Sequence, residues 1–300
     1  MLKVVYLGTP EFAVPPLLKL IDYDCKITGV ISQPDRKKDR KGNLIDTPVK
    51  AAAQKSGLKV YQFEKIKDSC DDLRRLNADI FITCAYGQIL SQEVLNIPRY
   101  GVFNIHASLL PKYRGAAPVQ WALINGEKKT GVTIMKTDIG IDSGEILLQK
   151  EIDIKDNDTG GTLLQRLSLL GAEAITEALD IIKSGEFSLQ AQDEKEASYY
   201  PLIKKEDAII DFSDDCKNIY NKIRAFNPAP VCFTHYNGDL LKVYTADIIE
   251  EDSLNKTAGM VTLSDCKKGL YVACGRGTLR LREIQLAGGK AMQDTELLRG

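Results

Sequence analysis

The sequence contains only two histidines, His106 and His235, and its seven cysteines are scattered without a CxxC pair. A transition-metal site usually needs clustered cysteine and histidine ligands, so this scarcity argues against one. An odd number of scattered cysteines also argues against a disulfide framework and is typical of reduced thiols in a reducing compartment. The sequence therefore predicts a protein without a metal centre and without disulfides.

Long hydrophobic runs are missing as well. No apolar run approaches the roughly 18 residues that a membrane helix needs, and the apolar stretch at the N-terminus is too short for a signal peptide. The charge is balanced, with 40 basic side chains against 41 acidic ones, which excludes a generally polycationic nucleic-acid coat protein and an acidic tail. We therefore expect a soluble cytoplasmic protein, in which any contact with nucleic acid comes from a local patch.

The first part of the chain alternates short β-branched runs with helical stretches, an order that is typical of an α/β domain with a parallel sheet. At 300 residues the chain is long for one core, so one large and one small domain are expected. We place the large domain at residues 1–189, with a long helix over 162–184. Its expected strands are 3–8, 26–32, 59–62, 79–86, 102–106 and 131–136.

The remainder of the chain has a different pattern. Residues 190–206 are polar, have no core-forming pattern and are predicted to be a linker. After a helix near 216–226, short strands with tight turns predict a small β-barrel of the oligonucleotide-binding type over residues 207–300, and a sandwich is the alternative. The expected strands are 231–236, 240–249, 258–263, 269–274 and 278–284.

Two polar side chains share one face of the predicted strand 102–106. Because side chains alternate across a strand, Asn104 and His106 point the same way. Ligands bind outside the carboxyl ends of strands in open α/β sheets, and an amide beside an imidazole suits a carbonyl whose oxygen becomes negative during attack. The alternative is that Asn104 caps a loop and His106 is a hydrogen-bonded core histidine. The following loop, which has Pro111 and Gly115 as stops, places apolar surface and free backbone groups beside the histidine and favours a site.

A turn-rich loop after the next predicted strand carries Asp142. Its carboxylate could orient His106 or relay a proton. The alternative is structural, because Asp-x-Gly patterns such as the one at 138–140 commonly form Asx turns. The residues alone leave both interpretations open.

Taken together, the motifs resemble the folate-dependent formyltransferase family. Asn104-x-His106 is followed by Ser108-Leu109-Leu110-Pro111 and later by Asp142. The resemblance extends along essentially the whole chain and is strongest to the members that act on charged initiator tRNA. Its further motifs are GTPEFA (8–13), QPDR (33–36), AYG (85–87), RGAAPVQ (114–120), GVTIM (131–135) and IRAFNP (223–228).

This resemblance implies a Rossmann-like first domain and an oligonucleotide-binding-type barrel as the second. It implies a monomeric enzyme of translation initiation that transfers a formyl group from 10-formyltetrahydrofolate to the free α-amine of methionyl initiator tRNA, without a metal. On this basis Asn104, His106 and Asp142 carry the catalysis. The folate contact falls to the loop residues Ser108, Leu109, Leu110 and Pro111.

A short segment after the second predicted strand is rich in cations, namely Arg36, Lys37, Lys38, Arg40 and Lys41. A run of charge is usually a solvated loop. In this family the segment resembles an inserted loop that grips the tRNA acceptor stem, where attraction to phosphate is the main physical term. In the second domain basic and acidic residues nearly balance, so a surface facing RNA would need a segregated patch. The candidates for it are Arg276, Arg280, Arg282 and Lys290.

Four other functions fit this sequence less well. A sugar-nucleotide N-formyltransferase would share the site motifs, but the basic loop argues against it. A glycinamide ribonucleotide formyltransferase would not need residues 206–300, and a nicotinamide-dependent dehydrogenase should have G-x-G-x-x-G where this chain has GTPEFA. A non-catalytic RNA-binding protein gives no role to Asn104, His106 and Asp142.

Overall fold

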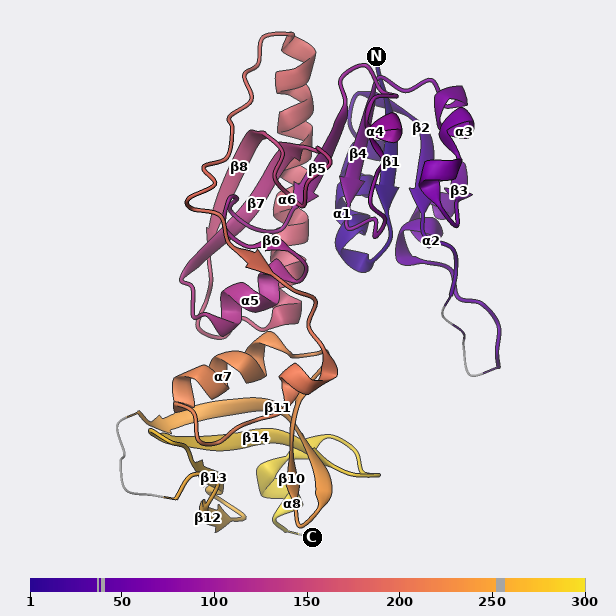
Figure 1. Ribbon diagram of the computed structural model, residues 1–300. Helices are drawn as coiled ribbons and strands as arrows, with labels where there is room; N and C mark the ends of the chain where they lie inside the picture. The colour runs from indigo at the N-terminus through magenta and orange to yellow at the C-terminus, as the bar shows by residue number, and fades with distance from the viewer. Residues whose placement is uncertain (37, 39–40, 252–256, 300) are drawn as a thin grey trace. The chain divides into compact units, whose positions relative to one another are not determined.

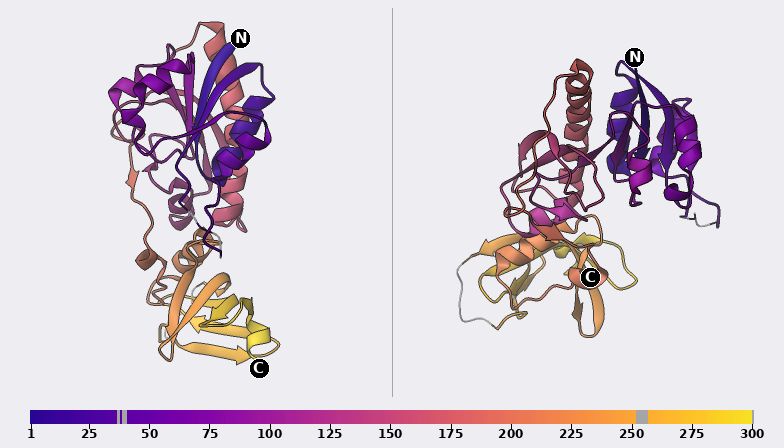
Figure 2. Two further views of the ribbon diagram at one scale, coloured as in Figure 1. Left: turned by 90° about the vertical axis from the view of Figure 1, so that its right-hand side faces the viewer. Right: turned by 45° about the horizontal axis from the view of Figure 1, so that its top comes forward.

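The computed structural model describes residues 1–36, 38, 41–251 and 257–299 (Figure 1). The chain forms two compact units, and Figure 2 shows their elements from two other sides. The first unit contains Met1–Gly115, Thr130–Ile152 and Leu164–Tyr199, and the second contains Ala116–Lys129, Asp153–Leu163 and Tyr200–Gly300. The chain passes between the units several times. The boundaries expected at 189 and 206 stay predictions for how the domains divide.

The first unit is built on a seven-stranded sheet in the order β3-β2-β1-β4-β5-β7-β8. The strands are β1 (Leu2–Gly8), β2 (Cys25–Ser32), β3 (Val60–Gln62), β4 (Ile80–Cys84), β5 (Val102–His106), β7 (Lys129–Lys136) and β8 (Ile146–Asp153). The helices are α1 (Val14–Ile21), α2 (Pro48–Lys55), α3 (Cys70–Arg75), α4 (Gln92–Leu95) and most of α6 (Gly160–Ser184), with short 3-10 turns at η1 (Glu11–Ala13) and η2 (Ile66–Asp68). The Rossmann-like class expected from the sequence is confirmed.

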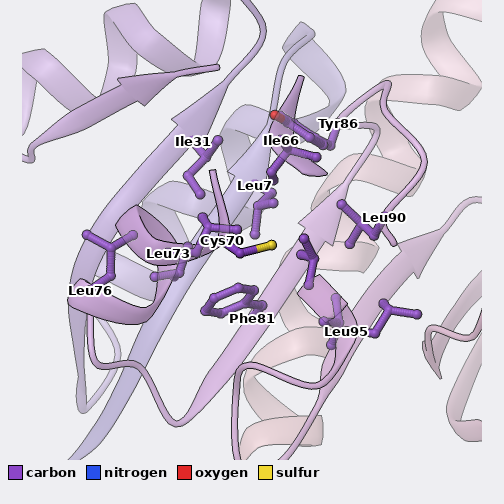
Figure 3. Packing of buried hydrophobic residues seen from close by; sticks show 13 residues of the cluster. Leu7, Ile31, Ile66, Cys70, Leu73, Leu76, Phe81, Tyr86, Leu90 and Leu95 are labelled. Carbon is purple, nitrogen blue, oxygen red and sulfur yellow. The ribbon is translucent and has the colours of Figure 1, made fainter. Parts of the chain in front are cut away.

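Strands β1 and β4 are almost continuously apolar because both of their faces are covered, as is usual for parallel strands. On one face, Leu7 and Phe81 pack against Leu73 of α3 (Figure 3). Helix α6 packs on the face of β5 that carries Ile105. A Cβ added to Gly171 of α6 would lie only 2.9 Å from the Ile105 side chain. Since Asn104 and His106 point away from Ile105, their face of β5 is the one that α6 does not cover.

The expectation of a parallel sheet is confirmed for the pairs among β1 to β5 and is wrong at β7. Strand β7 pairs antiparallel with β5, with His106 opposite Thr133 and Phe103 opposite Lys136. The physical reason is the path of the chain. Strand β7 begins beside the carboxyl end of β5, so it must run in the opposite direction to β5. Strand β8 was not predicted from the sequence, although half-buried and exposed residues alternate along most of it, as expected for an edge strand.

The second unit contains an antiparallel sheet in the order β10-β11-β14-β13-β12, with β15 paired to β14. The strands are β10 (Cys232–Tyr236), β11 (Asp239–Glu250), β12 (Val261–Asp265), β13 (Gly269–Ala273), β14 (Thr278–Leu286) and β15 (Met292–Gln293). The unit also holds α5 (Pro118–Ile124), η3 (Lys205–Ala208), α7 (Cys216–Ala225) and α8 (Asp294–Leu297). A separate two-stranded sheet is formed by β6 (Arg114–Gly115), which belongs to the first unit, and β9 (Tyr199–Tyr200). The predicted antiparallel strands are confirmed. In the described residues no ladder joins β10 to β12, so closure into a barrel stays a prediction.

A buried ion pair holds α8 to this sheet. The Asp294 carboxylate is 0% exposed and accepts hydrogen bonds from Arg280 at 2.7 and 2.9 Å and from the Leu270 N–H at 3.0 Å. Burial raises the pKa of Asp294, but these hydrogen bonds and that of the Thr295 N–H outweigh it and hold the pKa below its ordinary value. Arg280, a candidate for the RNA-facing patch, is therefore already committed to a carboxylate, and Arg282 pairs with Asp247 at 2.8 Å.

Asp294→Ala is expected to lower the free energy of unfolding by about 3–5 kcal/mol, because it leaves the Arg280 guanidinium partly buried without its partner. Urea denaturation followed by circular dichroism measures the change. Since the folded-state pKa is lowered, the contribution is present above the unfolded-state carboxyl pKa and is lost as pH falls through the folded one. Asp239→Ala, an exposed acid on β11, is the control; an equal loss in both variants would contradict the prediction.

Candidate active site

His106 ends β5 and is almost completely buried, with 6% of its surface exposed. Its Nε2 lies 2.9 Å from the backbone oxygen of Tyr113. A carbonyl oxygen can only accept, so Nε2 carries a hydrogen, and in the neutral ring Nδ1 is then the basic nitrogen. That Nδ1 lies 3.6 Å from Asp142 Oδ2. The ring nitrogen of His106 that is not bound to Tyr113 therefore faces a carboxylate.

Asp142 reaches this position by an indirect path. Because β7 is antiparallel to β5, its last residue, Lys136, lies beside Phe103, and the loop that follows must return along β5 to reach His106. Asp142 adopts a φ of 50°, which is uncommon for a residue other than glycine. Its carboxylate accepts a hydrogen bond of 2.8 Å from the Gly115 N–H, which fixes its direction. Asp142 was interpreted from the sequence as a group that could orient His106 or relay a proton, and the structure brings the two side chains within 3.6 Å of each other.

Asn104 is half-buried on the same face of β5 as His106. The Thr83 hydroxyl, from the paired position on β4, donates to Asn104 Oδ1 at 2.9 Å. This bond orients the amide so that Nδ2, a donor of two hydrogens, remains available. Across the described part of the chain no acceptor is bonded to Nδ2. Asn104 can therefore donate to a ligand oxygen on this face.

The loop at 108–111 is fixed from within. The Thr133 hydroxyl donates to the Ser108 backbone oxygen at 2.6 Å and accepts from the Leu110 N–H at 3.1 Å, and Gln149 donates to the Leu110 oxygen at 2.8 Å. The side chains of Ser108 and Leu110 are buried. Of the four residues predicted to contact folate, only Leu109 and Pro111 are half-exposed.

Arg114 is a buried arginine that the sequence analysis did not place in the site. Its side chain is 0% exposed, and its guanidinium contacts the side chains of Gln192, Glu194 and Tyr199. These partners all lie within the polar segment 190–206 that was predicted as a linker, and Gln192 also contacts the Asp142 loop. No local pattern could reveal these contacts, because the partners are 78 to 85 residues away from Arg114 along the chain.

The basic loop is described only in part. Lys37 and Arg40 lie outside the described residues. Arg36 is exposed and forms an ion pair of 3.1 Å with Glu64, Lys38 forms a bridge to Leu44, and Lys41 is exposed.

The two ends of this loop are held together at Asp35. Its carboxylate accepts from the Thr47 N–H at 3.1 Å, from Gln62 at 3.0 Å and from the Lys50 ammonium. Burial raises the pKa of Asp35, but these hydrogen bonds outweigh it and lower the pKa below its ordinary value. The Asp35 charge is thus compensated at the base of the loop.

The family model described as formyl transferase matches residues 2–179, and the one described as formyl transferase, C-terminal domain, matches residues 202–300. The chain belongs to the formyl transferase family. Relatives named methionyl-tRNA formyltransferase include those of Caldanaerobacter subterraneus subsp. tengcongensis, 42% identical over 100% of this chain and 97% of the relative, and of Clostridium novyi, 41% identical with the same coverage. Both relatives therefore carry the name of the same enzyme of this family.

Solved structures share the fold. The N-formyltransferase from Helicobacter canadensis, in complex with folinic acid and dTDP-3-aminofucose, matches with a TM-score of 0.69 and 20% identity, over 97% of this chain and 100% of that one. No described helix is long and apolar enough to cross a membrane. Over residues 1–36, 38, 41–251 and 257–299 no cluster of three or more His, Cys, Asp or Glu side chains could hold a metal ion.

Proposed function

We propose that this chain transfers a formyl group from 10-formyltetrahydrofolate to the α-amine of methionyl initiator tRNA. The observation that carries the proposal is the His106–Asp142 pair beside the free amide of Asn104, a set of groups suited to attack on a carbonyl. The names of relatives that are 41–42% identical over the whole chain support the same acceptor. A monomer in the cytoplasm, where initiator tRNA is used, stays a prediction.

The reaction needs no covalent enzyme intermediate. The attacking α-amine has an ordinary pKa of about 7.7–8.0, so a usable fraction is neutral near pH 7. Its nitrogen forms a bond to the formyl carbon and gives a tetrahedral oxyanion, which the Asn104 amide stabilises by hydrogen bonding. His106 donates to this oxyanion only when its Nδ1 carries a proton, because Nε2 is bound to the Tyr113 oxygen. The bond from that carbon to the folate nitrogen then breaks, and Asp142 helps a proton move from the amine to this nitrogen.

The folate donor is proposed to lie on apolar side chains that border this site. Leu109 and Pro111 are half-exposed, and Ile139 and Ile141, which precede Asp142 in its loop, are 71% and 62% exposed. Large apolar side chains exposed together on a loop are typical of a ligand surface. A flat pterin ring is a suitable partner for them, because burying both surfaces removes apolar area from water.

An acceptor competition tests the proposed function. Purified protein and 10-formyltetrahydrofolate are offered charged initiator tRNA, charged elongator methionyl-tRNA or an amino-sugar nucleotide, and formylated product is measured for each. We expect rapid formylation of the initiator tRNA only. Faster formylation of the amino sugar would contradict the proposal and favour a sugar N-formyltransferase. The structural neighbour that binds dTDP-3-aminofucose does not decide between them, because its likeness at 20% identity shows the fold alone.

The basic loop is the proposed tRNA contact, made by Arg36, Lys37, Lys38, Arg40 and Lys41. Each cation that neutralises a phosphate releases condensed counterion, so log affinity falls with log salt by roughly 0.7–0.9 per contact. Arg40→Ala combined with Lys41→Ala should therefore weaken tRNA binding and flatten its salt dependence by about one to two units. Binding of charged initiator tRNA at several salt concentrations measures both effects.

The matched control for this variant is Lys55→Ala combined with Lys67→Ala, which removes the same charge from exposed positions of the first unit. Affinity for the folate donor should be unchanged in both double variants, which also checks folding. If the loop variant keeps the salt slope of the control, the loop is a solvated surface. tRNA recognition would then have to rest on other residues.

A further inference from the structure

The backbone of residues 113–115 binds the side chains of both His106 and Asp142. The Tyr113 carbonyl accepts from His106 Nε2 at 2.9 Å, and the Gly115 N–H donates to Asp142 Oδ2 at 2.8 Å. These two backbone groups belong to the peptide units on either side of Arg114. A shift of Arg114 would therefore move the imidazole and the carboxylate relative to each other.

Arg114 is itself held in one place. Its two terminal nitrogens donate to the two oxygens of Glu194 at 2.8 and 3.0 Å, and Tyr199 and Gln192 bind the same guanidinium. Its backbone N–H donates to the Ser198 oxygen at 2.8 Å. A planar guanidinium whose donors are engaged from several directions has a single orientation, which is the geometric advantage of arginine over lysine.

Gln192 extends this arrangement to the Asp142 loop. Its Oε1 accepts from Arg114 Nε at 3.0 Å, which fixes the direction of the amide. Its Nε2 therefore donates to two backbone oxygens, that of Asp142 at 2.9 Å and that of Gly144 at 2.7 Å. Asp142 has a positive φ of 50°, a left-handed conformation that is uncommon for residues other than glycine, although aspartate adopts it more readily than most. The Asp142 loop is thus held at its carboxylate by Gly115 and at its backbone by Gln192.

We propose that Arg114 and Gln192 are positioning residues that set the geometry of His106 and Asp142 for the transfer step. This inference rests on the proposed function, because it needs Asp142 to act in catalysis. It gives the polar segment at 192–199 a role as part of the frame of the active site. Neither side chain has to touch the substrate, so changes in them should affect turnover more than donor binding.

The test is a double-mutant cycle between Gln192→Glu and Asp142→Asn. Gln192→Glu keeps an oxygen for Arg114 and replaces the NH₂ group with an oxygen that repels the two loop carbonyls. We expect kcat to fall by about 10- to 10²-fold, the scale of a misplaced reacting group. The KM for 10-formyltetrahydrofolate should change by no more than a few-fold. The matched control is Gln190→Glu, because Gln190 is an exposed glutamine two residues before Gln192.

The cycle separates positioning from a general loss of structure. If Gln192 acts through Asp142, then Gln192→Glu should have almost no further effect on kcat in the Asp142→Asn background. Single-turnover assays with excess enzyme keep these slow rates measurable, and thermal unfolding reports on folding. Losses that multiply in the double variant would overturn the inference, as would a Gln192→Glu rate equal to that of Gln190→Glu. If Asp142→Asn alone turns over normally, the catalytic assignment itself fails, which is a distinct result.

A second variant tests Arg114 directly. Arg114→Lys keeps the charge and loses the planar fork that binds Glu194 and Gln192 together. The variant should bind the folate donor within a few-fold of the parent and lose at least as much kcat as Gln192→Glu. Normal turnover in a folded Arg114→Lys protein would show that the charge alone suffices and would overturn the positioning role.

Discussion

His106→Ala is expected to lower kcat by about 10²- to 10³-fold or more, and Asn104→Ala by a similar factor, the scale of a lost oxyanion donor. Both side chains lie on the face of β5 that α6 does not cover. The Asn104 amide has its oxygen bound by Thr83, so its N–H groups are the ones available to donate to a developing oxyanion. Single-turnover transfer from 10-formyltetrahydrofolate to charged initiator tRNA measures the loss of rate.

The protein offers a matched control, because its other histidine, His235, is an exposed residue of β10 in the second unit. His235→Ala should react at the parental rate. His106→Ala also removes the 2.9 Å hydrogen bond to the buried Tyr113 oxygen, to which the Ser108 hydroxyl still donates at 3.5 Å, at a cost of roughly 0.5–1.5 kcal/mol, so the Tm of each variant must be measured. Near-parental transfer by a folded His106→Ala or Asn104→Ala protein would remove that residue from the catalytic set.

Asp142→Asn is expected to lower turnover by about 10²- to 10⁴-fold, the range that general acid–base groups contribute. An asparagine Oδ1 can still accept from the Gly115 N–H, so the loop should keep its place. What is lost is the negative charge 3.6 Å from His106 Nδ1, and with it a proton acceptor. Stopped-flow or quench measurements of kcat, with donor affinity measured in parallel, follow the effect.

The control for this change lies in the same loop. Asp138 accepts hydrogen bonds from the Gly140 N–H and from Ser143, and Asp138→Asn removes an equal charge without touching the His106 pair. We expect Asp138→Asn to retain most of its activity and Asp142→Asn to keep its folate affinity within a few-fold. A collapse of affinity with an unchanged kcat would make Asp142 a binding group and would contradict its proposed role.

Much of the first unit follows from local pattern. The run 102–106 was predicted with the same bounds as β5, and the period of two along it placed Asn104 and His106 on one face. That deduction needs no tertiary information, because the pleat of a strand sends alternate side chains to opposite sides. The antiparallel strands of the second unit were predicted for a similar reason. Their tight turns, such as Asn237-Gly238 with φ values of 51° and 90°, have a sequence signature of their own.

The sequence by itself thus determined which side chains share the face of β5 and where most of the strands lie, with β8 as an exception, because both depend on neighbours along the chain. Only the tertiary structure decided that β7 runs backwards, that Asp142 returns to His106, and that the buried Arg114 binds Gln192 and Glu194. These contacts join residues 27 to 80 positions apart, and they depend on the path of the whole intervening chain. Local period and propensity carry no information about that path.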